Sequence, residues 1–166
     1  STAIEKGRVL PTDYRQIHFL IHQPLAIANL SFFGTPYTPM FFNWSYMRPR
    51  EELDAVWQTI PDQVDVLISH GPPKGFLDVT RDMHTRSPVH VGSKSLTRHV
   101  VQRIKPLVHA FGHIHDEKGI RNFGAVSDGG TIFINCSCCN IANELVNPGI
   151  VVDIDPIRRT CSLQSN

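Results

Sequence analysis

Short apolar runs alternate with amphipathic stretches along the chain, a pattern that predicts an α/β fold. Residues 64–68 and 107–111 are mostly apolar and rich in valine, isoleucine and leucine, as is typical of strands buried on both faces. Between them, Ser93 can cap a helix that extends to about residue 105 and carries one apolar stripe. Because a strand–helix–strand crossover makes its two strands parallel, we expect both strands to end at the same edge of a sheet.

The other patterns predict the remaining elements of a single α/β domain. Residues 25–33 suggest a hairpin around Asn29, and Pro49 precedes apolar residues at helical spacing. Glycines at 129 and 130 predict a turn before a strand over residues 131–136, and two final strands are expected over 149–153 and 160–163. The segment between His70 and about residue 92 is predicted to be a long loop.

Composition narrows the class of protein. The chain has 166 residues, of which 41% are hydrophobic, so it is long and apolar enough for one domain with a core. The formal net charge of +1 makes polymeric nucleic acid an unlikely partner and argues against a polybasic membrane anchor. No apolar run is long enough to span a membrane, and residues 1–6 carry no signal core, so we expect a cytoplasmic protein. Four cysteines without a Cys-x-x-Cys spacing are predicted to be buried, reduced thiols: Cys136, Cys138, Cys139 and Cys161.

Histidines carry the candidate chemistry, because each of the two buried strands runs directly into one. His70 opens a His-Gly-Pro-Pro segment, and His113 and His115 form a Gly-His-x-His segment. Ligands of open α/β sheets bind just beyond the carboxyl ends of the strands. In extended backbone, side chains two positions apart share a face, and neutral imidazole is a good ligand for Zn, Mn, Fe or Ni. We therefore predict that His70, His113 and His115 converge on a metal.

The other candidate residues leave alternatives open. His109 is expected to pack inside its strand, whereas His84 and His90 lie in the loop and could reach a substrate. Arg48 and Arg50 could meet a phosphate, or be solvated charges at a helix start. Five aromatic residues close together in sequence could stack on a ring, although packing over the sheet edge is favoured: Tyr37, Phe41, Phe42, Trp44 and Tyr46.

The strand-end segments VDVLISHGPP (64–73) and LVHAFGHIH (107–115) resemble the C-terminal half of a calcineurin-like metallophosphoesterase. The greatest similarity is to the metallophosphoesterase-domain-containing subfamily, also called class III cyclic nucleotide phosphodiesterase-like. Further stretches similar to that subfamily occur in the same order over residues 35–39, 71–78 and 147–153.

This resemblance implies part of an α/β/β/α sandwich and a metal-dependent phosphoesterase, in particular a phosphodiesterase, acting on a small phosphate ester. It also implies two divalent ions, Mn, Fe or Zn, with His70 and His113 on one ion and His115 on the other. A metal-activated hydroxide would then attack phosphorus.

The family's first three motifs, which supply its acidic ligands and its leaving-group acid, are not found in the sequence. We therefore expect residues 1–166 to be a single phosphoesterase domain lacking its N-terminal half and inactive by itself, with its catalytic and substrate-binding residues unknown. The alternative is a truncated, non-catalytic metal-binding or interaction module. This truncated version would leave apolar sheet surface exposed and favour self-association.

Overall fold

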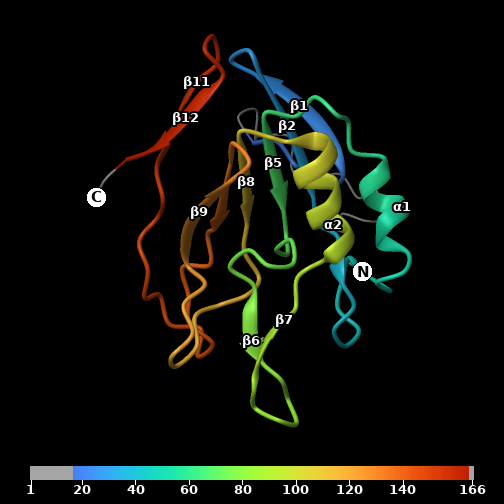
Figure 1. The fold of residues 1–166 in the computed structure, drawn as a ribbon, viewed down its shortest axis with the longest axis vertical. Helices are drawn as coiled ribbons and strands as arrows, with labels where there is room; N and C mark the ends of the chain where they lie inside the picture. Colours follow the sequence, from blue (N-terminus) through green and yellow to red (C-terminus); the bar gives the residue numbers. More distant parts are fainter. Residues whose placement is uncertain (1–16, 165–166) are drawn as a thin grey trace.

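A six-stranded sheet organises the protein, whose computed structural model describes residues 17–164. The strand order is β1-β2-β5-β8-β10-β9 (Figure 1). The four inner strands pair in parallel, and β1 and β9 form antiparallel edges. The strands span β1 (Gln23–Ile27), β2 (Leu30–Thr35), β5 (Val66–Ser69), β8 (Val108–Phe111), β9 (Gly124–Asp128) and β10 (Thr131–Asn135).

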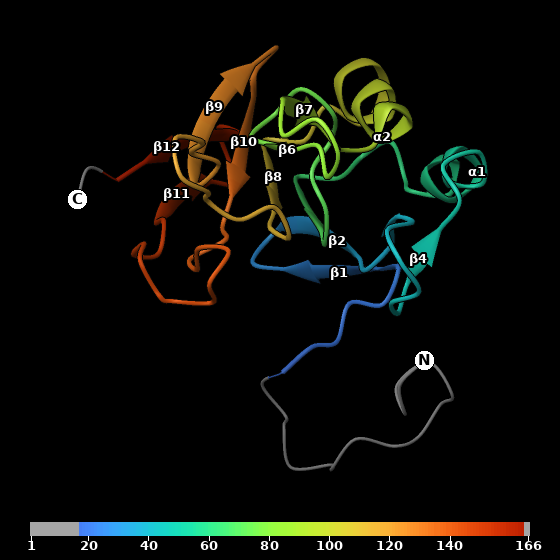
Figure 2. The same cartoon turned by 90° about the horizontal axis from the view of Figure 1, so that it is seen from below.

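Different elements cover the two faces of the sheet (Figures 1 and 2). Helices α1 (Leu53–Gln58) and α2 (Lys94–His99) pack on one face, and α2 continues as one turn of π-helix, η1 (Val100–Ile104). The hairpin of β11 (Val152–Asp155) and β12 (Thr160–Leu163) lies against the other face. Side chains alternate between these layers, because successive strand residues point to opposite faces. Phe33, Leu67, Phe111 and Phe133 pack with the helices, and Val66, Val108, Ile132 and Ile134 pack with the hairpin.

Four short strands complete the structure near the carboxyl ends of the parallel strands. Strands β3 (Thr38–Pro39) and β4 (Met47–Arg48) pair in parallel. Strands β6 (Val79–Arg81) and β7 (Pro88–His90) form a hairpin that projects beyond the carboxyl ends of the sheet (Figure 1, bottom). The prediction of a long loop in this region was therefore wrong. The hairpin carries few apolar residues, and its pairing depends on tertiary contacts.

The structure confirms the α/β class and the main sequence predictions. The β1–β2 hairpin turns at Ala28 and Asn29, both with positive φ, and β5 and β8 are parallel. The Ser93 hydroxyl caps α2 by accepting a hydrogen bond from the Leu96 backbone N–H. We expected strand β5 to be buried on both faces, but Ile68 is 40% exposed. This residue is not in the cluster that packs against the β11–β12 hairpin.

Two details of the strands differ from the sequence predictions. The strand expected at 149–153 begins only at Val152. Strand β9 was not predicted, since its residues lack an apolar pattern.

No helix within residues 17–164 is long and apolar enough to cross a membrane. The segment 1–6, used in predicting the compartment, lies outside the described residues.

Candidate metal centre

The ends of β5 and β8 bring two of the predicted ligands together. The Gly112 backbone N–H donates to the His70 carbonyl oxygen at 3.1 Å, which extends the pairing of the two parallel strands past their last residues. The His70 and His113 rings consequently lie with their centroids 4.6 Å apart. A side chain at Gly71 would collide with the Thr38 hydroxyl, which explains the glycine after His70. Parallel strand ends therefore place these imidazoles side by side, as the sequence predicted.

His113 reaches this position through a backbone conformation that the sequence did not predict. Its φ is +72°, in the left-handed region that non-glycine residues rarely adopt. The Ile114 N–H donates to the Gly112 carbonyl at 2.9 Å, so the chain bends here instead of continuing as a strand. The expectation that His113 and His115 share one face of extended backbone was therefore wrong. Both residues nevertheless line one cleft of about 620 Å³.

A backbone carbonyl orients the ring of His115. The distance from His115 Nδ1 to the Asn140 carbonyl oxygen is 3.0 Å. Because a carbonyl only accepts hydrogen bonds, Nδ1 carries the proton and the neutral ring keeps a lone pair on Nε2. Metal-binding histidines commonly donate their second ring N–H to a carbonyl in this way. His115 is thus held in a tautomer suited to metal binding.

Desolvation keeps the neighbouring imidazoles neutral. Desolvation, with smaller contributions from the nearby His70 and His115, lowers the pKa of His113 to about 4. Desolvation also lowers the pKa of His70, although part of that ring reaches solvent. These rings are therefore neutral near pH 7, the protonation state that can donate a lone pair to a cation.

The described residues provide imidazoles for a metal but little negative charge. No group of three or more His, Cys, Asp or Glu side chains within residues 17–164 is arranged to hold a metal ion. None of the described residues that line the cleft has a carboxylate side chain, whereas Arg50 adds a positive charge to it. The donor set is chemically suited to divalent transition metals, whereas two such ions would need anionic ligands from elsewhere.

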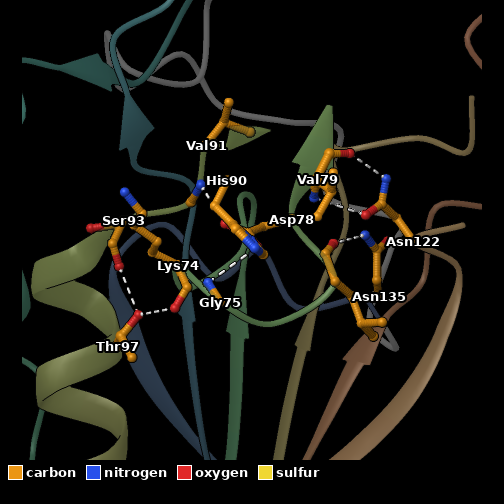
Figure 3. A network of polar contacts seen from close by, with 12 residues as sticks. Lys74, Gly75, Asp78, Val79, His90, Val91, Ser93, Thr97, Asn122 and Asn135 are labelled. Atoms are coloured by element: carbon orange, nitrogen blue, oxygen red, sulfur yellow. Dashed lines mark hydrogen bonds and ion pairs between the residues drawn. The ribbon is translucent and has the colours of Figure 1, made fainter. Parts of the chain in front are cut away.

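Two buried asparagines, both labelled in Figure 3, hydrogen-bond to the backbone of the loop that carries the histidines. Asn135 donates to the carbonyl oxygens of Leu77 and Ile114, both at 2.9 Å. Asn122 donates to the His115 carbonyl at 2.9 Å and exchanges two hydrogen bonds with the Val79 backbone. Neither asparagine was predicted from the sequence. The one available signal was the position of Asn135, a polar residue at the carboxyl end of an apolar strand.

Two carboxylates near the cleft have structural partners. Asp78 is fully buried and accepts hydrogen bonds from the Gly75 and Gly92 backbone N–H groups and from His90 Nδ1 (Figure 3). Asp116 accepts from the backbone of residues 122 and 123 and from Asn147. Desolvation raises the pKa of Asp116, but these hydrogen bonds outweigh it and leave the pKa lowered. Both carboxylates therefore stabilise loops by accepting hydrogen bonds from backbone N–H groups.

The remaining candidates have separate roles. His84 and His90, from the β6–β7 hairpin, are not among the residues that line the cleft. Arg50 does line it, and its guanidinium donates to the carbonyl oxygens of Val91 and Gly92. Arg48 instead lies over the Tyr37 ring, 5.1 Å from its centroid. The four cysteines are free thiols as expected, but Cys136 is exposed and the others are only half-buried.

His109 is a core residue, as predicted, and its protonation gives a test of stability. Its ring is fully buried, with Nε2 2.8 Å from the Ser69 hydroxyl. That hydroxyl donates its proton to the Gly71 carbonyl, so His109 Nε2 donates to it, and Nδ1 has no partner among residues 17–164. Desolvation lowers the pKa of His109 to about 3.

Acidification is therefore expected to destabilise the protein through His109. Between the unfolded pKa near 6.5 and the folded value of about 3, only the unfolded state takes up the proton. Stability from this residue is complete above pH 6.5 and falls by at most about 1.4 kcal/mol per pH unit as the pH drops. Urea denaturation from pH 7 to 4.5 should show a shallower decline for His109→Gln than for the wild type. Equal declines would contradict this assignment.

Known proteins resemble this chain over most of its length. It is 33% identical to metallophosphoesterase domain-containing protein 1 of Homo sapiens over 163 residues, covering 93% of the chain and 47% of that protein. The Mus musculus protein of the same name matches equally. UPF0046 protein T07D4.2 of Caenorhabditis elegans is 34% identical over 82% of the chain and 32% of that protein. No family model matches.

The chain thus spans about half the length of the human and mouse relatives. The similarity covers the strand ends that carry His70, His113 and His115, since 93% of the chain is aligned. Together, these relatives support placing the chain in the metallophosphoesterase-domain family.

Proposed function

We propose that this chain contributes part of the metal centre of a phosphoesterase, in particular a phosphodiesterase. The observation that carries the proposal is the pairing of His70 and His113 at the ends of adjacent parallel strands, 4.6 Å apart, with His115 in the same cleft as His113. The family of its relatives supports the same chemistry. The substrate would be a small phosphate ester, which suits a cleft of about 620 Å³.

His70, His113 and His115 would hold the metal, with two divalent ions such as Mn, Fe or Zn in the complete site. When bound, the metal supplies a hydroxide nucleophile near neutral pH and polarises the phosphoryl group. Desolvation keeps His70 and His113 neutral, and the Asn140 carbonyl orients the ring of His115. Arg50 provides a positive charge in the cleft that can attract an anionic ester.

Metal removal tests this function. The protein that carries this chain, at its full length, is expected to hydrolyse an aryl phosphodiester with Mn²⁺ and to lose at least about 100-fold in rate after treatment with EDTA. Adding Mn²⁺ back should restore the rate. Residues 1–166 alone should show little turnover, because the described cleft lacks anionic ligands. A chelator-resistant rate in the full-length protein would contradict the proposal.

A non-catalytic metal-binding module remains the second candidate. It is favoured by the absence of carboxylates among the described residues that line the cleft. Three imidazoles can hold one Zn²⁺ without an acidic ligand. Calorimetry distinguishes the candidates: one tightly bound ion per chain with no hydrolysis by the full-length protein supports the module, and two ions with turnover support the phosphoesterase.

A further inference from the structure

The segment between β3 and β4 exposes an unusual group of apolar side chains. Met40 is 53% exposed, Phe41 46%, Phe42 62% and Trp44 59%. The three aromatic rings form one cluster, with centroids 4.4 to 6.2 Å apart. The sequence pattern favoured packing of this segment over the sheet edge, and these exposures show that the expectation was wrong for this cluster. Grouped exposed apolar side chains of this kind commonly mark a binding surface.

Only part of this cluster faces the histidines. Phe41 and Trp44 line the cleft that His113 and His115 also line, together with Arg50. Phe42 is not among its lining residues. The cleft therefore combines an aromatic wall, two imidazoles and one guanidinium. A ligand that uses all three would carry a ring and an anionic group.

The backbone around the cluster is held in place. Thr38 N–H donates to the Tyr46 carbonyl at 3.3 Å, and Met40 N–H donates to the Arg48 carbonyl at 2.9 Å. Met47 anchors the returning strand, since it is only 6% exposed. The aromatic rings are thus presented on a fixed frame, which reduces the ordering cost of binding a ligand.

We propose that Phe41 and Trp44 form a subsite for an aromatic ring of the phosphoester whose phosphate lies near Arg50 and the imidazoles. The Phe41 and Trp44 rings lie at 83° to each other, so they can offer one face and one edge to a guest. Aromatic guests gain from both geometries, whereas an alkyl group gains only burial. This proposal rests on the proposed function for the position of the phosphate.

Trp44 itself provides the measurement. The chain has two tryptophans, and Trp57 is fully buried, so a ligand-dependent change in fluorescence reports Trp44. Diphenyl phosphate, added to the metal-free chain of 166 residues, is expected to quench this fluorescence with saturation. Phe41→Ala should weaken the affinity by about 5- to 100-fold, the range for one lost stacking contact. Phe42→Ala is the matched control and should change it less than about two-fold, because Phe42 does not line the cleft.

Three results would overturn the subsite. The first is equal weakening by Phe41→Ala and Phe42→Ala, and the second is no saturable quenching by diphenyl phosphate. The third is equally tight binding of dicyclohexyl phosphate, which would identify a general apolar pocket instead of an aromatic one. Circular dichroism of each variant confirms folding.

The subsite and the proposed function can fail separately. Saturable binding of diphenyl phosphate, without metal binding or turnover by the full-length protein, would support the subsite and contradict the phosphoesterase function. Metal-dependent turnover with the same KM for wild type and Phe41→Ala would contradict the subsite and support the phosphoesterase function.

Discussion

Replacing His113 with alanine is expected to weaken Zn²⁺ binding to the chain by at least about 100-fold, more than the loss of a hydrogen-bonding partner behind a ligand typically costs. His113 adjoins both other candidates: its ring lies beside that of His70, and it lines the same cleft as His115. Isothermal titration calorimetry near pH 7, where desolvation keeps His70 and His113 neutral, measures the affinity directly.

His84→Ala is the matched control for this measurement. It removes the same side chain from an exposed position on the β6–β7 hairpin, outside the lining of the cleft. Its Zn²⁺ affinity should therefore equal that of the wild type. If both variants bind Zn²⁺ as tightly as the wild type, His113 is not a ligand.

The largest effect on stability is expected from Trp57→Ala, which should lower the free energy of unfolding by about 3–5 kcal/mol. Trp57 lies on α1 with no exposed surface, in the cluster that joins both helices to the sheet. Its indole N–H donates to the Ser93 hydroxyl at 3.2 Å, and Arg103 donates to its carbonyl oxygen. The substitution leaves a cavity and removes a hydrogen bond to the residue that caps α2.

Trp44→Ala provides the comparison, because it deletes the same side chain from a site that is 59% exposed. Its effect on the free energy of unfolding should stay within about 0.5 kcal/mol. Urea denaturation followed by circular dichroism measures both variants. Similar losses for the two would show that α1 does not form the core described.

The parts of the site that the sequence predicted depend on local patterns. The apolar runs of β5 and β8 and the Ser93 cap define a crossover, and a crossover brings both strand ends to one edge. That argument alone predicts that His70 lies near His113. It does not give the direction of a side chain beyond the end of a strand, so the bend at His113 was missed.

The supporting residues could not be predicted for a different reason. Asn122 and Asn135 bond to backbone atoms 7 to 58 positions away in sequence, and such pairs have no local signature. The β6–β7 hairpin likewise forms without an apolar pattern, because Asn122 bonds to the Val79 backbone at its first strand.

The sequence by itself determined the α/β order of elements, the parallel pairing of β5 and β8, and the meeting of His70 and His113, because periodicity and chain crossover are local or topological properties. Only the tertiary structure decided the left-handed turn at His113, the carbonyl that orients His115 and the exposure of Phe41 and Trp44 in the same cleft. Those features depend on which distant backbone groups and side chains the fold brings into contact, and periodicity does not encode such contacts.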